Sequence, residues 1–462
     1  MRTVGLGCLL TGLLLLHSGC TTSTAIQGNV EYYGNPHITE QLELDTVWAA
    51  NRANFDLHTK GDLQFVAYYD KDRMMTVASR ELGSDKWTKT TLSSKLHWDS
   101  HNYVVMGIDE KGFIHVSGNM HVNPLVYYRS AKPLDISNML ELHAMTGEQE
   151  DRVTYPKFYN DNDGKLLFNY RAGSCGDGNI LVKQFDTETM RWFDYMDRPL
   201  FLGVEDDNDR AAYHTYTRDA AGDFHFLWMW RWTPDVETCH QLCYAKTSDL
   251  RSWTNAFGEP VQLPHRPDVD ALIVDDSPSK GGLHNSRKEM ILDSKSQPIV
   301  GYVKYDQKGY TQLYLARPVN DSWLIKKVSD WDIRWEFIGG GDQMAREAQF
   351  DFEGFSDEGY LVITWKTTKD AGTYVVDTDT LEPVALPVKM KQKEPDSLED
   401  KLTDNAELIV HIRPDRGQSL DPQTHYVLKW ETQIGSHGKH APEVIPTEPT
   451  SKLYVVKIEE DK

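Results

Sequence analysis

The chain has few cysteines, no long apolar run beyond its first residues, and a deficit of basic side chains. Five cysteines occur among 462 residues, and Cys175, Cys239 and Cys243 remain once those near the N-terminus are set aside. An odd number argues against a complete disulfide framework in an exported chain. No later segment is long enough to span a bilayer. The formal charge of −21 argues against nucleic acid as a partner, although a local group of Arg and His can still bind an anionic sugar.

The N-terminus has the pattern of a targeting segment. Arg2 precedes an apolar run, Val4–Leu16, which is followed by small residues. The stretch that ends at Cys20 resembles a lipoprotein signal with Cys20 as the acylated residue, and ordinary cleavage near Ala25 is the alternative. We therefore expect residues 1–25 to be a signal peptide. The mature protein would be an outer-membrane lipoprotein, a periplasmic protein or a secreted one.

One short pattern returns along the chain. A turn that carries a Gly with acidic or Asn residues is followed by an alternating apolar strand, and copies begin at Gly61, Asp109, Asp161, Asp219, Ser296 and Asp357. The spacing is roughly 50 to 75 residues, the period of a four-stranded propeller blade with variable loops. A second marker, a polar turn closed by a Trp, precedes the next strand at Trp87, Trp192, Trp253 and Trp323.

These markers predict an all-β fold, a seven-bladed β-propeller, with six blades as the alternative. Residues 26–462 would form one catalytic domain, in which 26–45 are a polar lead-in and 389–404 a charged, solvated loop. No stretch between 45 and 388 shows the period of an apolar helix face. The strands that follow Ala406 are expected to close the propeller. We expect a monomer without an organic cofactor.

Two histidines are the first candidates for chemistry. If strands pair across the turn Asp109–Gly112, His101 and His121 lie opposite each other at the same end of the hairpin. Neighbouring imidazoles suit the abstraction and return of a proton because their pKa lies near neutral pH. A purely structural pair bonded to the backbone is the alternative.

Two arginines form the second candidate group. Arg210 enters a strand that is expected to pair with the strand ending at Arg231, so both would lie near the same end of the sheet. A guanidinium offers a planar fork for carboxylate or sulfate. Salt bridges to nearby acidic residues are the competing interpretation.

A Cys-x3-Cys segment could hold a metal ion. A disulfide between Cys239 and Cys243 would be awkward on one strand, and tetrahedral zinc is the competing interpretation. With four protein ligands, such a zinc would be structural. The expected ligands are His214, Cys239, Cys243 and His265, with His240 or His284 as replacements for either histidine.

Taken together, these segments resemble the BNR-repeat polysaccharide lyases, specifically the secreted ulvan lyases of polysaccharide lyase families 24 and 25. The resemblance covers roughly residues 45–390 and is carried by 101–129, 170–178, 210–214, 224–231 and 243–249. It implies a seven-bladed propeller, a structural zinc and an anionic sulfated polysaccharide as substrate. The implied reaction is eliminative cleavage beside a uronic acid in a sulfated rhamnose–uronate polymer.

The resemblance also implies a catalytic set of two histidines, a tyrosine and an arginine that neutralises the uronate. The histidines are placed on His101 and His121, the arginine on Arg210, and the tyrosine on Tyr195 or Tyr213. Further side chains expected to bind sulfate or stack on sugar rings are Arg171, Arg231 and Tyr244. The Gly-rich loop that holds Cys175 is expected at the rim of the site, and the thiol has no assigned role.

Two other functions fit the same architecture. A sialidase-like glycoside hydrolase would need a carboxylic acid and usually an arginine triad, which Arg171, Arg210 and Arg231 could imitate. A non-catalytic glycan-binding propeller would show binding without turnover. Elimination leaves an unsaturated uronate that absorbs in the near ultraviolet, and hydrolysis does not.

Overall fold

The computed structural model describes residues 28–460 except 205–208, 268, 341–345, 418–420, 422 and 437–440. The expected signal peptide and Cys20 lie outside the described residues. Within them the fold is all-β, as predicted, with short 3-10 turns and no α-helix. None of the helical turns in this part of the chain is long and apolar enough to cross a membrane.

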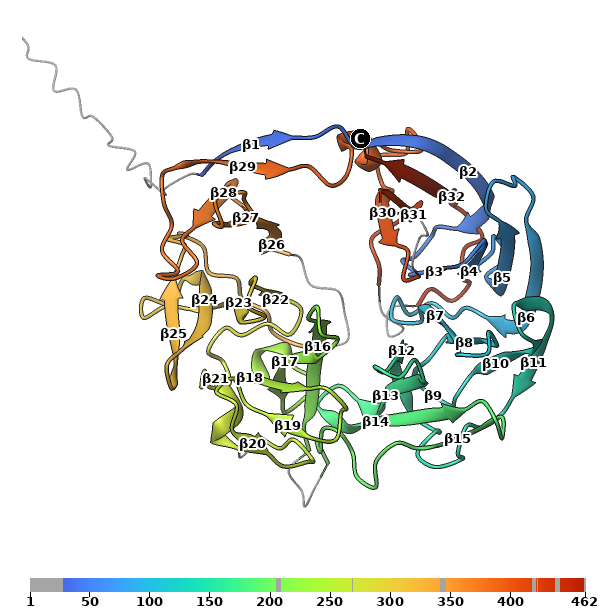
Figure 1. Ribbon diagram of the computed structural model, residues 1–462, viewed down its shortest axis with the longest axis horizontal. Helices are drawn as coiled ribbons and strands as arrows, with labels where there is room; N and C mark the ends of the chain where they lie inside the picture. Colours follow the sequence, from blue (N-terminus) through green and yellow to red (C-terminus); the bar gives the residue numbers. More distant parts are fainter. Residues whose placement is uncertain are drawn as a thin grey trace, which may run out of the picture.

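Seven sheets of three to six strands, counted over the described ranges, follow one another around a ring (Figure 1). The first two sheets contain β3 (Asp56–Lys60), β4 (Leu63–Tyr69), β5 (Met74–Glu81) and β6 (Thr88–Lys95), then β7 (Val104–Ile108), β8 (Ile114–Gly118), β10 (Tyr127–Lys132) and β11 (Asp135–Leu142). The third contains β9 (His121–Asn123), β12 (Val153–Asn160), β13 (Leu166–Ser174), β14 (Asp177–Asp186) and β15 (Arg191–Asp194).

The remaining sheets continue around the ring. The fourth contains β16 (Ala211–Arg218), β17 (Phe224–Arg231), β18 (Cys239–Thr247), β19 (Trp253–Thr254), β20 (Pro260–Val261) and β21 (Ile273–Asp275). The fifth contains β22 (Lys288–Leu292), β23 (Pro298–Tyr305), β24 (Thr311–Val319) and β25 (Ser322–Lys327), and the sixth β26 (Ala348–Phe355), β27 (Leu361–Thr367) and β28 (Ala371–Val376). The 3-10 turns are η1 (Val236–Thr238), η2 (Asp270–Leu272) and η3 (Asp396–Glu399).

The last sheet joins the two ends of the described chain. It contains β30 (Ile409–Pro414), β31 (Thr424–Thr432), β32 (Thr450–Glu459) and β2 (His37–Trp48). β2 pairs antiparallel with β32 from His37 opposite Glu459 to Trp48 opposite Thr450. Part of the segment expected to be a polar lead-in therefore belongs to a long strand, and β32, the last of the predicted C-terminal strands, holds it by a ladder of backbone hydrogen bonds.

The charged segment near 389–404 differs from the expected solvated loop. Its first residues belong to β29 (Pro387–Lys391), which pairs in parallel with β1 (Asn29–Tyr33). Val388 and Met390 are buried while Lys389 and Lys391 are exposed, which is the period of a strand with one covered face. Because lysines occupy the exposed alternate positions, the segment reads as a charged loop in the sequence.

The hydrophobic core lies between neighbouring sheets, where large aromatic side chains pack across the boundary. Phe55 stacks on Trp430 of β31 with ring centroids 4.7 Å apart. Trp192 and Trp253, which close two of the predicted polar turns, are buried, whereas Trp87 and Trp323 are half-buried. The strands nearest the centre of the ring are β3, β7, β12, β16, β22, β26 and β30 (Figure 1). Side chains from different sheets can therefore meet at the axis.

Candidate active site

The predicted histidine pair is formed. The β7–β8 register, in which Val104 opposes Gly118, places His101 and His121 opposite each other when it is continued past the strand ends. Their ring centroids are 4.2 Å apart with an angle of 34° between the rings. The expectation that the two imidazoles meet at one end of this hairpin is confirmed.

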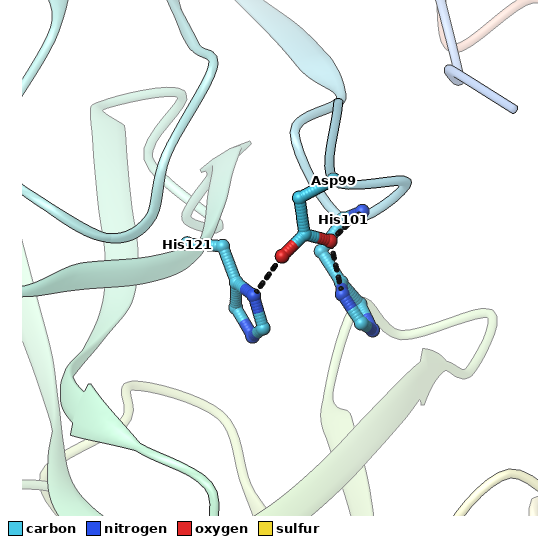
Figure 2. A group of neighbouring side chains, drawn as sticks. All are labelled: Asp99, His101 and His121. Atoms are coloured by element: carbon cyan, nitrogen blue, oxygen red, sulfur yellow. Dashed lines mark hydrogen bonds and ion pairs between the residues drawn. The ribbon is translucent and has the colours of Figure 1, made fainter. Parts of the chain in front are cut away.

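A carboxylate that sequence analysis did not select joins the two rings. Nδ1 of His101 lies 2.7 Å from one oxygen of Asp99, and Nδ1 of His121 lies 2.7 Å from the other (Figure 2). Burial alone would raise the pKa of Asp99, but the bonds from both imidazoles hold it well below its usual range. Asp99 is therefore a stable anion that fixes both rings. Its position two residues before His101 was the only signal in the sequence.

The two imidazoles differ in charge. Burial lowers the pKa of His101 below its ordinary value, and the bond to Asp99 opposes that shift only in part. Burial also acts against the charged form of His121, but Asp99 and the nearby Cys175 thiol outweigh it and raise the pKa to about 9. At neutral pH, His101 can accept a proton and His121 can donate one.

Two tyrosines extend the group towards the neighbouring sheets. The ring of Tyr155 on β12 lies 5.7 Å from the rings of both His101 and His121, and that of Tyr213 on β16 lies 6.4 Å from Tyr155. Tyr155 has a φ of 55°, where the β12–β13 register shifts, and this irregular backbone could not be foreseen. Of the two predicted tyrosines, Tyr213 lies in this group.

Two buried guanidiniums flank Tyr213. The guanidinium carbon of Arg171 lies 4.3 Å from the centre of the Tyr213 ring, and that of Arg231 lies 5.4 Å away. Arg231 also donates from Nη1 to the Tyr213 hydroxyl at 3.4 Å. Burial raises the pKa of Tyr213, so the hydroxyl keeps its proton at neutral pH. Positive charge is thereby concentrated beside a proton donor.

Cys175 completes the group from the turn between β13 and β14. Burial alone would raise the pKa of its thiol, but the His121 imidazole and the Arg231 guanidinium outweigh it and lower the pKa to about 7. Gly176, next in the turn, has a φ of 71°, and an added Cβ would lie 2.6 Å from the backbone of Thr233. Close packing of this glycine therefore holds the thiol at the site.

Arg210 lies apart from this group. Continuing the β16–β17 register, in which Ala211 opposes Arg231, places Arg210 opposite Trp232 and on the other face of the hairpin from Arg231. Its guanidinium lies 5.2 Å from the Trp232 ring, in a hollow that His240 also lines. The structure thus does not bring Arg210 into contact with the histidine pair.

Two predicted tyrosines serve the packing of other regions. The Tyr195 hydroxyl donates to the carbonyl of Asp249 at 2.8 Å. The Tyr244 hydroxyl lies 2.6 Å from Nδ1 of His225 and is buried. Neither ring contacts His101 or His121.

Several further cations lie close enough to affect one another's ionisation. Burial and the charges of Arg346 and Arg413 lower the pKa of Arg52 to about 10. Arg52 in turn disfavours the charged form of His101, and Arg287 lies near enough to Arg346 to be affected by it. Positive charge is thus concentrated locally in a chain with a formal charge of −21.

Comparison with known proteins identifies the family of this chain. The sequence pattern of the BNR repeat-containing family matches residues 63–331, which is more than half of the chain. The protein belongs to the BNR repeat-containing family. The resemblance of the sequence to BNR-repeat proteins is confirmed. A search of the curated proteins finds no match.

Solved structures share the fold of this BNR-repeat protein. Polysaccharide lyase Uly1 is 13% identical, with 91% of this chain and 99% of that chain covered and a TM-score of 0.57. An ulvan lyase of family PL25 is 15% identical, with 92% and 98% covered and a TM-score of 0.57. A PL25 ulvan lyase bound to -[GlcA(1-4)Rha3S]- is 15% identical, with 92% of this chain and 98% of that chain covered and a TM-score of 0.56.

The cysteines of this BNR-repeat protein do not form the expected pair of metal ligands. Cys239 lies opposite Arg231 and Cys243 opposite Trp228, but the register shifts between them at Gln241, which has a φ of 47°. An inserted residue reverses the alternation of faces, so the two thiols point to opposite sides of β18. Both are free thiols with raised pKa, about 11 for Cys239.

The expected histidine ligands lie on the Cys243 side, among aromatic rings. His265 lies 5.2 Å from the Trp228 ring, and the His214 ring stacks on Phe201 at 5.4 Å. Over the described ranges, the only group of three or more His, Cys, Asp or Glu with ligand atoms within 4.8 Å of one another is Asp99, His101 and His121. The four expected ligands therefore do not fit one tetrahedral zinc ion, whose bonds are only about 2.0–2.3 Å long.

Proposed function

We propose that this protein is a polysaccharide lyase that cleaves a sulfated rhamnose–uronic acid polymer, ulvan, by β-elimination. The observation that carries the proposal is the pair His101 and His121 on one carboxylate, Asp99, with one ring neutral and the other charged at neutral pH. Such a pair supplies a base and an acid side by side. The fold shared with ulvan lyases supports the same reaction class.

We propose that the seven sheets are the seven blades of a β-propeller. Their succession around one axis and the pairing of β2 with β32 support this count. Ends of inner strands from several blades then supply one site, which explains why residues from 99 to 231 in sequence meet there.

Elimination first needs the charge of the uronate carboxylate to be neutralised. The proton on C5, next to that carboxylate, is otherwise too weakly acidic to remove. We assign this role to the charge of Arg231, with Arg171 beside it, because both lie at Tyr213. Arg210, which the sequence favoured, faces Trp232 instead.

The proposed proton transfers use the two imidazoles. Neutral His101 takes the C5 proton, the electrons of that C–H bond form the C4–C5 double bond, and the C4–O4 bond breaks. The leaving O4 takes a proton from charged His121, while Tyr213 is placed to donate a hydrogen bond to the substrate. Asp99 holds both rings in orientation through their Nδ1 atoms while His101 gains a proton and His121 loses one.

The hydrolase alternative is less well supported. A glycosidase needs a carboxylic acid that holds a proton near neutral pH. The carboxylate at this site, Asp99, has a depressed pKa and both of its oxygens are bonded to imidazoles. Asp99 is therefore unsuited to act as the acid.

The direct test is near-ultraviolet absorbance while the purified protein acts on ulvan, with heparin and alginate as comparison polymers. A rise with ulvan alone supports the proposal. Binding of ulvan without any rise, by protein shown to be folded, would leave a glycan-binding propeller as the better account.

Residues 1–25 are proposed to direct export, with a lipid anchor on Cys20, and the mature protein is proposed to be a monomer. The mass of the protein recovered from its host tests cleavage and acylation together. Light scattering tests the oligomeric state.

A further inference from the structure

A cavity of about 310 Å³ lies at the axis, among the inner strands. Side chains from five inner strands, β3, β7, β12, β16 and β30, or from the residues beside them line it. The lining residues that matter for its charge and polarity are Asp56, Tyr103, Lys157, Tyr216, Arg413 and Arg416. The cavity is therefore built by several sheets at once.

The cavity contains more positive than negative charge. Asp56 binds Nη1 of Arg416 at 2.7 Å and accepts from the backbone nitrogen of Met106 at 2.8 Å. Among the described residues, Lys157 and Arg413 make no hydrogen bond or ion pair through their side chains. Two half-buried cations thus lack a hydrogen-bonded counter-ion in a partly open cavity, an arrangement that costs free energy unless an anion is supplied.

The pKa values of Lys157 and Arg413 are both lowered, as expected for cations that are partly removed from water. Burial and the charge of Arg416 lower the pKa of Lys157 to about 8. Burial also lowers the pKa of Arg413, and Asp56 opposes that shift only in part.

The cavity is distinct from the histidine site. Lys157 lies two residues beyond Tyr155 along β12, and Tyr216 lies three residues beyond Tyr213 along β16. At about 3.3 Å per residue, these side chains start roughly 7–10 Å further along the inner strands. Neither His101 nor His121 lines the cavity.

We propose that this axial cavity is a binding site for a tetrahedral oxyanion, sulfate or phosphate, either free or as an ester on a larger ligand. The guanidinium of Arg413 offers a planar fork to two oxygens, and the ammonium of Lys157 offers a point charge. Asp56 keeps Arg416 in place and limits the net charge. The site does not depend on the elimination chemistry.

The test is calorimetric titration of the folded protein with sodium sulfate, at an ionic strength held constant with sodium chloride. Wild type should bind sulfate at one site, and Lys157→Met and Arg413→Met should each weaken binding at least tenfold. Lys326→Met is the matched control because that lysine pairs with Glu382 on the surface, and it should bind as wild type does.

Thermal unfolding in chloride separates loss of a ligand from loss of the fold. Removing this half-buried, unpaired cation should leave the Tm of Lys157→Met unchanged or higher, because repulsion is relieved. Sulfate also stabilises proteins generally, so the relevant quantity is the extra rise in Tm of wild type over Lys157→Met. Equal sulfate binding by wild type and Lys157→Met, or none by wild type, would overturn the proposal.

The source of the oxyanion is resolved by two ligands. A sulfated monosaccharide that competes with sulfate, while its sulfate-free parent does not, identifies an ester on a sugar. Competition by inorganic sulfate and phosphate alone identifies a free anion. Both measurements can be made on a His101→Asn variant, so their outcome stands apart from that of the lyase proposal.

Discussion

His101 and His121, twenty positions apart in the chain, donate to opposite oxygens of one carboxylate with their rings 4.2 Å apart. Sharing Asp99 gives the two rings different roles, because the environment lowers the pKa of one and raises that of the other.

Replacing Asp99 by Asn should reduce kcat/KM on ulvan by about a hundredfold or more, the scale of general acid–base catalysis. The amide cannot hold the charge on His121, so the pKa of that imidazole falls and the basic limb of the pH–rate profile moves to lower pH. Asp219→Asn is the matched control, because Asp219 contacts another buried imidazole, His225, away from the site. Equal losses in the two variants would show a general effect on folding.

The folded pKa of His121, about 9, lies above its unfolded value of about 6.5. The stabilisation that it contributes is therefore fully present below pH 6.5 and is lost as pH rises through 9. Wild type should exceed His121→Gln in free energy of unfolding by about 1–3 kcal/mol more at pH 6 than at pH 10. Denaturant titrations at the two values measure this difference, and a constant gap would contradict the raised pKa.

Arg231 and Arg210 should differ sharply when changed. Arg231→Lys keeps the charge but loses the planar fork, and its kcat/KM should fall at least about tenfold. Arg210→Lys, over Trp232, should stay within about threefold of wild type. Initial rates on ulvan, with Tm as the check on folding, decide between them. A larger loss of kcat/KM for Arg210→Lys than for Arg231→Lys would favour Arg210 as the residue that neutralises the uronate.

Cys175 should be the reactive thiol. Its rate of alkylation by iodoacetamide should rise with pH through about 7, because the thiolate is the nucleophile. Cys239 and Cys243 are buried with raised pKa and should remain unmodified in the folded protein. Peptide mass spectrometry identifies the modified thiol. The modified protein should lose activity, and Cys175→Ala should resist the reagent.

Sequence reasoning succeeded where a regular alternation decided the geometry. The pairing of β7 with β8 needed only the Asp109–Gly112 turn, and it placed His101 opposite His121. The expected pairing of the strands at Arg210 and Arg231 is also formed, but Arg210 precedes the residue opposite Arg231 and therefore points to the other face, over Trp232.

Local irregularities account for most of the remaining differences. The shift at Gln241 separates Cys239 from Cys243, and Tyr155, whose ring lies beside His101 and His121, has a left-handed backbone. Gln241 and Tyr155 both have a positive φ, but neither is a glycine or an asparagine, the residues that most often adopt this conformation. Asp99 could not be selected from the sequence because no distinctive motif surrounds it.

The central claim is that the protein cleaves ulvan by elimination through the imidazole pair. The most direct measurement is the mass of the oligosaccharides released from ulvan by wild type and by His101→Asn. The account predicts wild-type products that are lighter by one water than the products of hydrolysis, and no release by folded His101→Asn. Products of hydrolytic mass, or unchanged release by the variant, would contradict it.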